Sequence, residues 1–216
     1  MSLARPLLSI ACSLLALGVL APAPHAAVVI NEVDYQQPVS DNAEFIELKN
    51  TGSSAVSLSG YTVELVEVVS GAASVYKTLT LPSATVPANG YYVICFGLGT
   101  VSNCSVFFGP TVSAIHNTLP GAIGLRNAGV LVDAVSWGGS VPAPYTEGTG
   151  CPQADDGVNY GIGLSRFPDG VDTNDNSVDW SRRCISPGLP NSAGSSGCIP
   201  VNARTSCWGA LKACYR

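Results

Sequence analysis

Three glutamates near the start of the chain, Glu32, Glu44 and Glu47, are the first residues whose type and spacing could do chemistry. Two carboxylates that flank a glycosidic bond can act as the acid and base of a glycosidase, and two adjacent strands could bring these side chains together. Glutamates near a sheet edge more often face solvent or pair with a base such as Arg126 or Arg166. We expect a structural role for them, and a small secreted hydrolase that uses acidic residues is the alternative.

The most oxygen-rich run of the chain is Asp169–Asp179 (DGVDTNDNSVD). Side-chain oxygens stand at every second position of its middle part: Asp172, Asn174 and Asn176. That spacing suits Ca²⁺, but Ser177 replaces the glycine of a calcium loop and Arg183 stands where its bidentate glutamate should be. Asp and Asn side chains also cap their own backbone in turns. We expect an Asx-rich turn over Asp172–Asp179, with calcium binding as the alternative.

A serine or cysteine hydrolase needs a base oriented beside its nucleophile, and the sequence offers little for one. His116 is the histidine of the mature chain, because His25 lies at the end of the leader described below. No G-x-S-x-G elbow occurs, and the glycine-rich Ser136–Ser140 is predicted to be the end of a strand. We therefore expect no catalytic residue and no cofactor.

Four aromatic residues also have the chemistry of a binding platform: Tyr91, Tyr92, Trp137 and Trp180. An exposed planar cluster of such rings would stack on sugars, whereas rings inside a sandwich fill its core. We expect these four rings in the core.

Short apolar stretches separated by turn residues must position all of these groups. The expected strands cover residues 28–33, 43–49, 61–69, 74–81, 90–96, 121–126, 130–137 and 162–167. Alternation in residues 43–49 predicts a half-buried strand, and the nearly all-apolar residues 90–96 predict a central strand covered on both faces. Gly71 and Asn127–Gly129 predict hairpin turns. Strands at this spacing, without a long helical period, predict an all-β sandwich.

Several ordered pieces of the chain match the pattern of a known family. They are Ile30–Val33, Glu44–Leu48 with Asn50, Leu58–Tyr61, Leu81–Pro82 with Val86–Gly90, Ala122–Leu125, Asp133–Trp137, Leu164–Arg166 with Pro168–Gly170, and Ser186–Gly188 with Pro190–Asn191. Together they resemble a lamin-tail domain of the bacterial secreted kind. The resemblance implies an immunoglobulin-like β-sandwich over residues 27–191, a binding or scaffolding role, and no catalytic residues to carry over. Bacterial members often accompany secreted enzymes, and this chain carries no such enzyme domain.

Residues 1–26 have the order of a secretory signal peptide. Arg5 supplies a positive charge, Leu7–Leu20 is an uncharged apolar run, and Ala21–Ala27 brings small residues and prolines. A membrane-spanning helix needs about 20 apolar residues, so this run is too short. We expect cleavage near Ala26, with an uncleaved anchor as the alternative, and a protein that is secreted, periplasmic or at the cell surface.

The chain has eight cysteines, and removal of Cys12 with the leader leaves seven. Export favours disulfides, while no CxxC pair supports a zinc site. We expect one bond, Cys95–Cys104, across a turn. We expect a second, Cys151–Cys184, that ties the long loop to the end of the domain.

Residues 192–216 are expected to form a linker and a cysteine-containing tail outside the sandwich. Trp208, Leu211 and Tyr215 stand at helical spacing. A helix would place Cys207 and Cys214 about 10 Å apart along its axis, too far for a disulfide. We therefore expect a Cys198–Cys207 bond and a free thiol at Cys214. The tail is either a docking or sorting signal or a loosely packed end.

Charge and composition narrow the class of partner. Without Arg5 the chain carries nine Lys and Arg against fifteen Asp and Glu, a net charge of −6. An acidic chain does not suit the phosphate backbone of nucleic acids, and no second stretch is long enough to span a membrane. We expect a non-catalytic exported module that binds a protein or a cell-surface ligand, and a structural envelope component is a further alternative.

Overall fold

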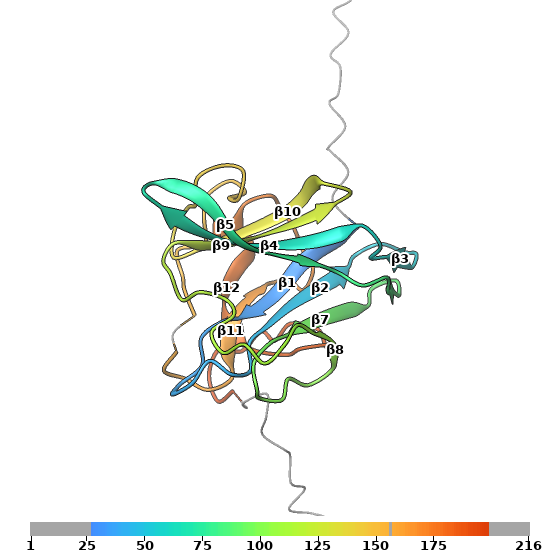
Figure 1. The fold of residues 1–216 in the computed structure, drawn as a ribbon. Coiled ribbons are helices and arrows are strands. Elements are labelled where there is room, and N and C mark those ends of the chain that lie inside the picture. Colours follow the sequence, from blue (N-terminus) through green and yellow to red (C-terminus); the bar gives the residue numbers. More distant parts are fainter. Residues whose placement is uncertain (1–26, 156, 199–216) are drawn as a thin grey trace, which may run out of the picture.

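The computed structural model describes residues 27–155 and 157–198 (Figure 1). Its elements in chain order are β1 (Val28–Asp34), β2 (Phe45–Asn50), β3 (Val56–Ser57), β4 (Tyr61–Val69), β5 (Ala72–Thr80), β6 (Thr85–Val86), β7 (Tyr91–Cys95), β8 (Cys104–Phe107), β9 (Gly121–Asn127), β10 (Val130–Trp137), β11 (Ile162–Arg166), α1 (Asn176–Asp179) and β12 (Trp180–Cys184). The expected leader, Cys207, Cys214 and the helical part of the tail lie outside the described residues. No helix in the described part is long and apolar enough to cross a membrane.

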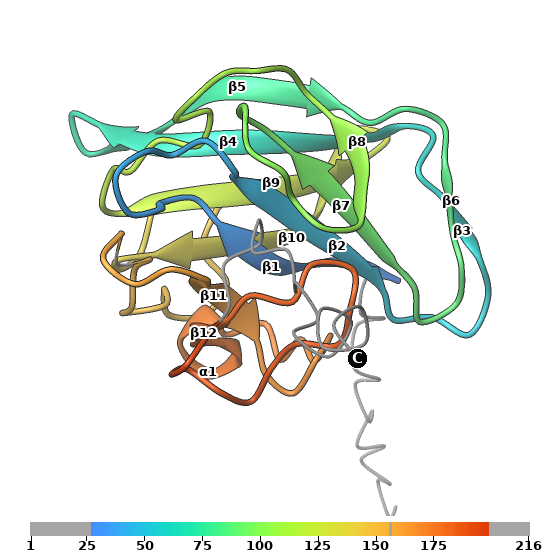
Figure 2. The ribbon, with the colours of Figure 1, turned by 90° about the horizontal axis from the view of Figure 1, so that it is seen from below.

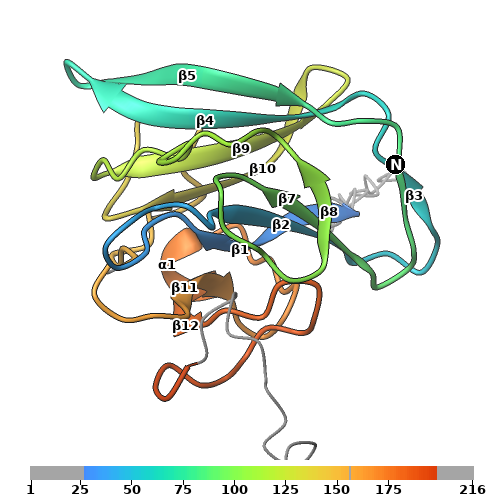
Figure 3. The same ribbon diagram turned by 60° about the horizontal axis from the view of Figure 1, so that its bottom comes forward.

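Two larger sheets form the layers of the molecule (Figures 2 and 3). One has six strands in the order β12-β11-β1-β2-β7-β8, and the other has four strands in the order β10-β9-β4-β5. A small β3-β6 ladder stands apart from both sheets. Every described strand pair is antiparallel except β7 with β8. The expected immunoglobulin-like β-sandwich is thus confirmed.

Two tight turns fix the register of the four-stranded sheet. The β4–β5 hairpin turns at Ser70 and Gly71, with φ angles of 51° and 80°. The β9–β10 hairpin turns at Ala128 and Gly129, with φ angles of 48° and 83°. Two successive positive φ angles match the right-handed twist of the flanking strands. Both hairpins predicted from glycine positions are therefore present.

The core lies between the two sheets. Leu65, Ile123 and Val135 come from the four-stranded sheet, and Ile30, Ile46 and Ile94 are among the residues that meet them from the six-stranded sheet. Trp137 stacks on Tyr35 with ring centroids 4.8 Å apart. Trp180 and Tyr92 are buried in the same cluster, so three of the four aromatic residues fill the core as expected. Tyr91 is only half-buried and takes part in a polar group described below.

The six-stranded sheet differs from the expectation in its burial and its extent. Every residue of β2 is buried, although alternation predicted a half-buried strand. The second face is covered by loop residues that bond to its polar side chains, such as Gly188 on Glu47. Strands β8 and β12 were not expected, because β8 is short and β12 (WSRRC) is rich in polar residues.

Candidate functional site

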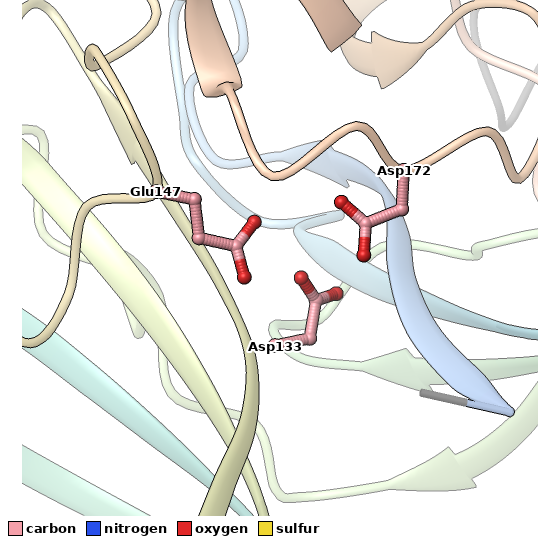
Figure 4. Close-up of side chains that lie close together, drawn as sticks. All are labelled: Asp133, Glu147 and Asp172. Atoms are coloured by element: carbon pink, nitrogen blue, oxygen red, sulfur yellow. The ribbon is translucent and has the colours of Figure 1, made fainter. Parts of the chain in front are cut away.

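Three carboxylates from three separate segments meet beside the six-stranded sheet. Asp133 lies on β10, Glu147 on the loop that follows it, and Asp172 on the loop after β11; Figure 4 shows their carboxylates turned toward one another. One oxygen of each lies within 4.8 Å of the others. Oxygen groups at this separation are the ligand set of a hard divalent cation. The group is therefore the first place to look for a metal site.

The positive charge among these carboxylates comes from Arg166, at the end of β11. Its Nη2 lies 2.8 Å from Asp133 Oδ1 and 3.7 Å from Glu147 Oε2. Its Nη1 lies 3.1 Å from Asp172 Oδ1 and 2.9 Å from Asp179 Oδ2. The Arg166 side chain is completely buried. A fixed guanidinium thus occupies the position that a metal ion would need, and the arrangement is an ion-pair network.

Four carboxylates facing one guanidinium leave an excess of negative charge. Burial raises the pKa of Asp133, against the attraction of Arg166. Burial, followed by repulsion from Asp133 and Asp172, raises the pKa of Glu147 to about 8. A raised pKa favours the protonated form of Glu147, in which a proton shared with Asp133 would neutralise one of the four charges. Such a proton lowers the repulsion within the network.

The network also satisfies backbone groups of β1. The Ile30 N–H donates to Asp133 Oδ2 at 2.5 Å, and Arg166 Nε donates to the Ile30 carbonyl at 2.8 Å. The register of β1 with β2 shifts between Ile30 and Glu32, and β11 pairs with β1 only at Glu32 and Val33. Side chains thus replace the missing strand partner of Ile30. Since Asp133 belongs to the four-stranded sheet and Arg166 to the other, the pair also joins the two layers.

Family membership follows from a match that covers the first part of this sandwich. The family model of the lamin tail domain matches residues 21–139, more than half of the chain. The chain belongs to the lamin tail domain family. No curated protein matches it. The matched residues end just after β10. In this lamin tail domain, β11, β12 and Arg166 therefore lie after the matched segment, although they complete the six-stranded sheet and the ion-pair network.

The three glutamates that suggested acid catalysis are completely buried, which corrects the expectation that they face solvent or pair with a base. Glu44 accepts hydrogen bonds from the Ala114 and Ile115 N–H groups at 2.6 and 3.0 Å. Glu32 accepts from the Ser186 N–H at 3.0 Å. In each case a carboxylate on a strand (Glu32) or directly before one (Glu44) holds the backbone of a distant loop.

The basic residues expected beside these glutamates bond elsewhere. Arg126 pairs with Glu64 at 2.7 Å, and Arg166 pairs within the network described above. Burial raises the pKa of Glu44 to about 8 and that of Glu47 to about 7. Glu32 and Glu47 lie opposite each other in the β1–β2 register, but neither side chain is exposed. A sugar therefore cannot reach the pair.

A polar group missed in the sequence surrounds Asp169, just after β11. Asp169 Oδ2 accepts from Lys49 Nζ at 2.5 Å and from the Tyr91 hydroxyl at 2.7 Å. Its Oδ1 accepts from Asn31 Nδ2 at 2.9 Å, and Asn31 also donates to Glu47 at 2.8 Å. These bonds lower the pKa of Asp169 against the effect of burial. The group fastens the loop after β11 onto β1, β2 and β7.

The Asx-rich turn expected over Asp172–Asp179 is present at Asp172 and Asp175, whereas residues 176–179 form the short helix α1. Asp172 Oδ1 accepts from the Asn174 N–H and from Arg166. Asn176 Oδ1 accepts from the Ser136 N–H at 3.0 Å, while its Nδ2 donates to the Ala134 carbonyl at 2.9 Å. Asp179 accepts from Thr173. The side-chain oxygens at positions 172 and 176 thus turn to different protein donors and do not converge on one point.

His116 lies on the surface, away from these groups. Its Nδ1 is 3.0 Å from Glu67 Oε2, and its ring stacks on Tyr76 with centroids 3.9 Å apart. The glycine-rich Ser136–Ser140 segment ends β10, as predicted, and Ser136 is buried. The structure does not bring this histidine and this serine together as base and nucleophile.

The cysteines confirm one expected pair and correct two. Cys95 and Cys104 are bonded across the turn as predicted. Cys184 is bonded to Cys198, 14 positions later, so the predicted Cys151–Cys184 and Cys198–Cys207 bonds are wrong. Cys151 is a buried free thiol that donates to the Trp180 carbonyl. The sequence after β12 folds back to put Cys198 within reach, with Gly194 accepting from the Cys184 N–H.

Proposed function

We propose that this lamin tail domain is a non-catalytic, exported binding or scaffold module that recognises a protein or surface ligand outside the cytoplasm. The observation that carries the proposal is the use made of the buried carboxylates. Those of Glu32, Glu44, Glu47 and Asp133 each accept a hydrogen bond from backbone or amide donors of the same chain. Side chains that catalysis would need are thus committed to holding loops and strands.

Export is supported by two independent features. The expected leader at residues 1–26 would carry the chain out of the cytoplasm. The bonds Cys95–Cys104 and Cys184–Cys198 suit an oxidising compartment, where disulfides persist.

A surface hollow supplies a place where a ligand would bind. Asp34, Val39, Tyr160 and Ile185 are among its lining residues, and its cavity volume is about 230 Å³. Val39 is 98% exposed and has a φ angle of 76°. A β-branched residue in the left-handed region is strained, and such strain concentrates at functional sites. The strained loop presents an apolar side chain to solvent where a partner would contact it.

Capture from the cell surface tests this function. The purified protein and a Val39→Asp, Tyr160→Ser variant would each serve as bait for a surface and culture-medium fraction. We expect a ligand that the first bait retains and the variant loses. Val178→Asp is the matched control, because Val178 is 67% exposed on α1 and should not affect binding.

A catalytic assay tests the alternative that the protein is a hydrolase. The protein would be incubated with a panel of glycosides, esters and peptides. Turnover above the buffer rate that disappears in Glu47→Gln, with the fold intact by circular dichroism, would replace the binding proposal with the hydrolase alternative.

A further inference from the structure

The edge strands of the two sheets differ in whether other parts of the chain bond to their outward backbone groups. Along β10, the Ala134 N–H donates to Glu147 and the Ser136 N–H donates to Asn176. Along β12, the Arg182 N–H donates to Gln153, and the Cys184 N–H donates to Gly194. Edge strands of soluble proteins are blocked in this way because their open backbone groups would pair with another chain.

Strand β8 limits its exposed edge by length. It has four residues, and the Cys95–Cys104 bond ties it to β7. Strand β5 has nine residues and forms the other edge of the four-stranded sheet, where Figure 3 shows it bordering open space. Among the described residues, no backbone group of another segment bonds to the outward backbone of β5; the His116 N–H reaches this strand only at the Tyr76 hydroxyl. This edge is long, open and carries one charged residue, Lys77.

The register of β5 with β4 identifies the outward-facing backbone groups. The Leu81 N–H donates to the Tyr61 carbonyl, so by alternation Thr80 and Thr78 face outward. At the other end, Val69 and Ala72 close the two-residue turn as a bonded pair, so Ala73 and Val75 face outward. The outward positions are Ala73, Val75, Thr78 and Thr80.

A bulge lies between these two halves but keeps their spacing regular. Val75 lies opposite Val66, and Thr78 lies opposite Glu64. Those β4 residues are two positions apart, which is the normal interval between bonding sites on one side of a strand. The edge therefore offers four evenly spaced donor–acceptor positions.

This set of positions is complementary to itself. In an antiparallel two-fold arrangement, Ala73 would face Thr80 of a second copy, and Val75 would face Thr78. Both pairs are neutral, and Lys77 would face Tyr76 of the second copy instead of another cation. An edge without acidic residues also avoids like-charge repulsion between two acidic chains.

We propose that two copies of this chain associate through β5, antiparallel, and join their four-stranded sheets into one continuous sheet. The interface is isologous, because the same four positions serve both copies. It does not depend on the proposed binding function, since the hollow at Val39 lies on other elements.

A charge exchange at two positions tests both the interface and its register. In Val75→Lys, Thr78→Lys, each new lysine would face a lysine of the second copy. In Val75→Glu, Thr78→Glu, each new glutamate would face a glutamate. We expect the unmodified chain to have the mass of two copies by light scattering after size exclusion at micromolar concentration, and each double variant to have the mass of one. An equimolar mixture of the two variants should return to the mass of two.

The control separates loss of association from loss of folding. Val130→Lys places a charge on the exposed start of β10 and should leave the dimer intact. All variants should keep the circular dichroism spectrum of the parent. A monomeric parent would overturn the proposal, and so would double variants that stay dimeric or folded variants that fail to associate with each other.

Discussion

Replacing Arg166 by methionine is the sharpest test of the ion-pair network. The change keeps similar bulk but leaves Asp133, Asp172 and Asp179 without their cation. Removing one partner of a buried ion pair costs about 3–5 kcal/mol. The Ile30 carbonyl loses its donor as well, which adds about 1 kcal/mol or more. The two losses add to about 4–6 kcal/mol, which for a domain of this size corresponds to a fall of roughly 8–24 °C in melting temperature at about 2–4 °C per kcal/mol.

The pH dependence of this loss has a defined sign. Without Arg166, Asp133 and Glu147 have folded pKa values further above their unfolded values, because the effect of burial is no longer opposed by the attraction of the guanidinium. Their contribution to stability is therefore lost as pH rises through the folded pKa. The deficit of the Arg166→Met protein should thus be largest at neutral pH and smaller at about pH 5.

Urea unfolding followed by tryptophan fluorescence measures the effect, because Trp137 and Trp180 are buried. Arg126→Met is the matched control. Its side chain is 24% exposed, in contrast to the fully buried Arg166, and pairs with Glu64, so we expect a loss below about 1 kcal/mol. A stability of Arg166→Met within about 1 kcal/mol of the parent, or an equal deficit at both pH values, would refute this role of Arg166.

Four further outcomes are expected. Glu44 has a folded pKa of about 8, above its usual value, so the free energy of unfolding falls as pH rises from about 4.5 towards 8. Glu44→Gln should make the free energy from urea unfolding depend less on pH across that range, and an unchanged slope would contradict this. Cys184→Ser opens a loop of 14 positions and should lower the free energy of unfolding by about 3 kcal/mol. In the parent, iodoacetamide followed by peptide mapping should label Cys151 only in denaturant, and labelling of Cys151 in the native protein would contradict its burial. Added calcium should leave the melting temperature unchanged, because the Asp172 and Asn176 oxygens already accept protein donors, and a rise would restore the calcium interpretation.

Local patterns predicted the strands and hairpins well because both depend on residues close in the chain. Gly71 and Asn127–Gly129 placed two turns correctly, and Cys95–Cys104 closes a short loop. The bond Cys184–Cys198 was missed because residues 192–197 were assigned to a linker, whereas the chain after β12 folds back onto that strand. Secondary-structure patterns carry no information about such a return.

The site was misjudged for a related reason. Glu44 and Ala114 are 70 positions apart, and Glu32 and Ser186 are 154 apart. Their burial depends on loops packing over a strand, and alternation along residues 43–49 cannot show that a second face is covered. A useful signal was present, since Glu44 and Glu47 lie within an otherwise apolar stretch. Acidic residues in such a setting are rarely buried without a dedicated partner.

The family match and the ion-pair network cover different lengths of the chain. The lamin tail domain match ends at residue 139, yet β1 has β11 as its second strand neighbour. Asp133, inside the match, is buried against Arg166, outside it. A chain ending at residue 139 would leave Asp133 without its cation and one side of β1 without its strand. We therefore propose that residues 140–191 belong to the same cooperative unit as the matched segment, because Arg166 and β11 supply what Asp133 and β1 lack without them.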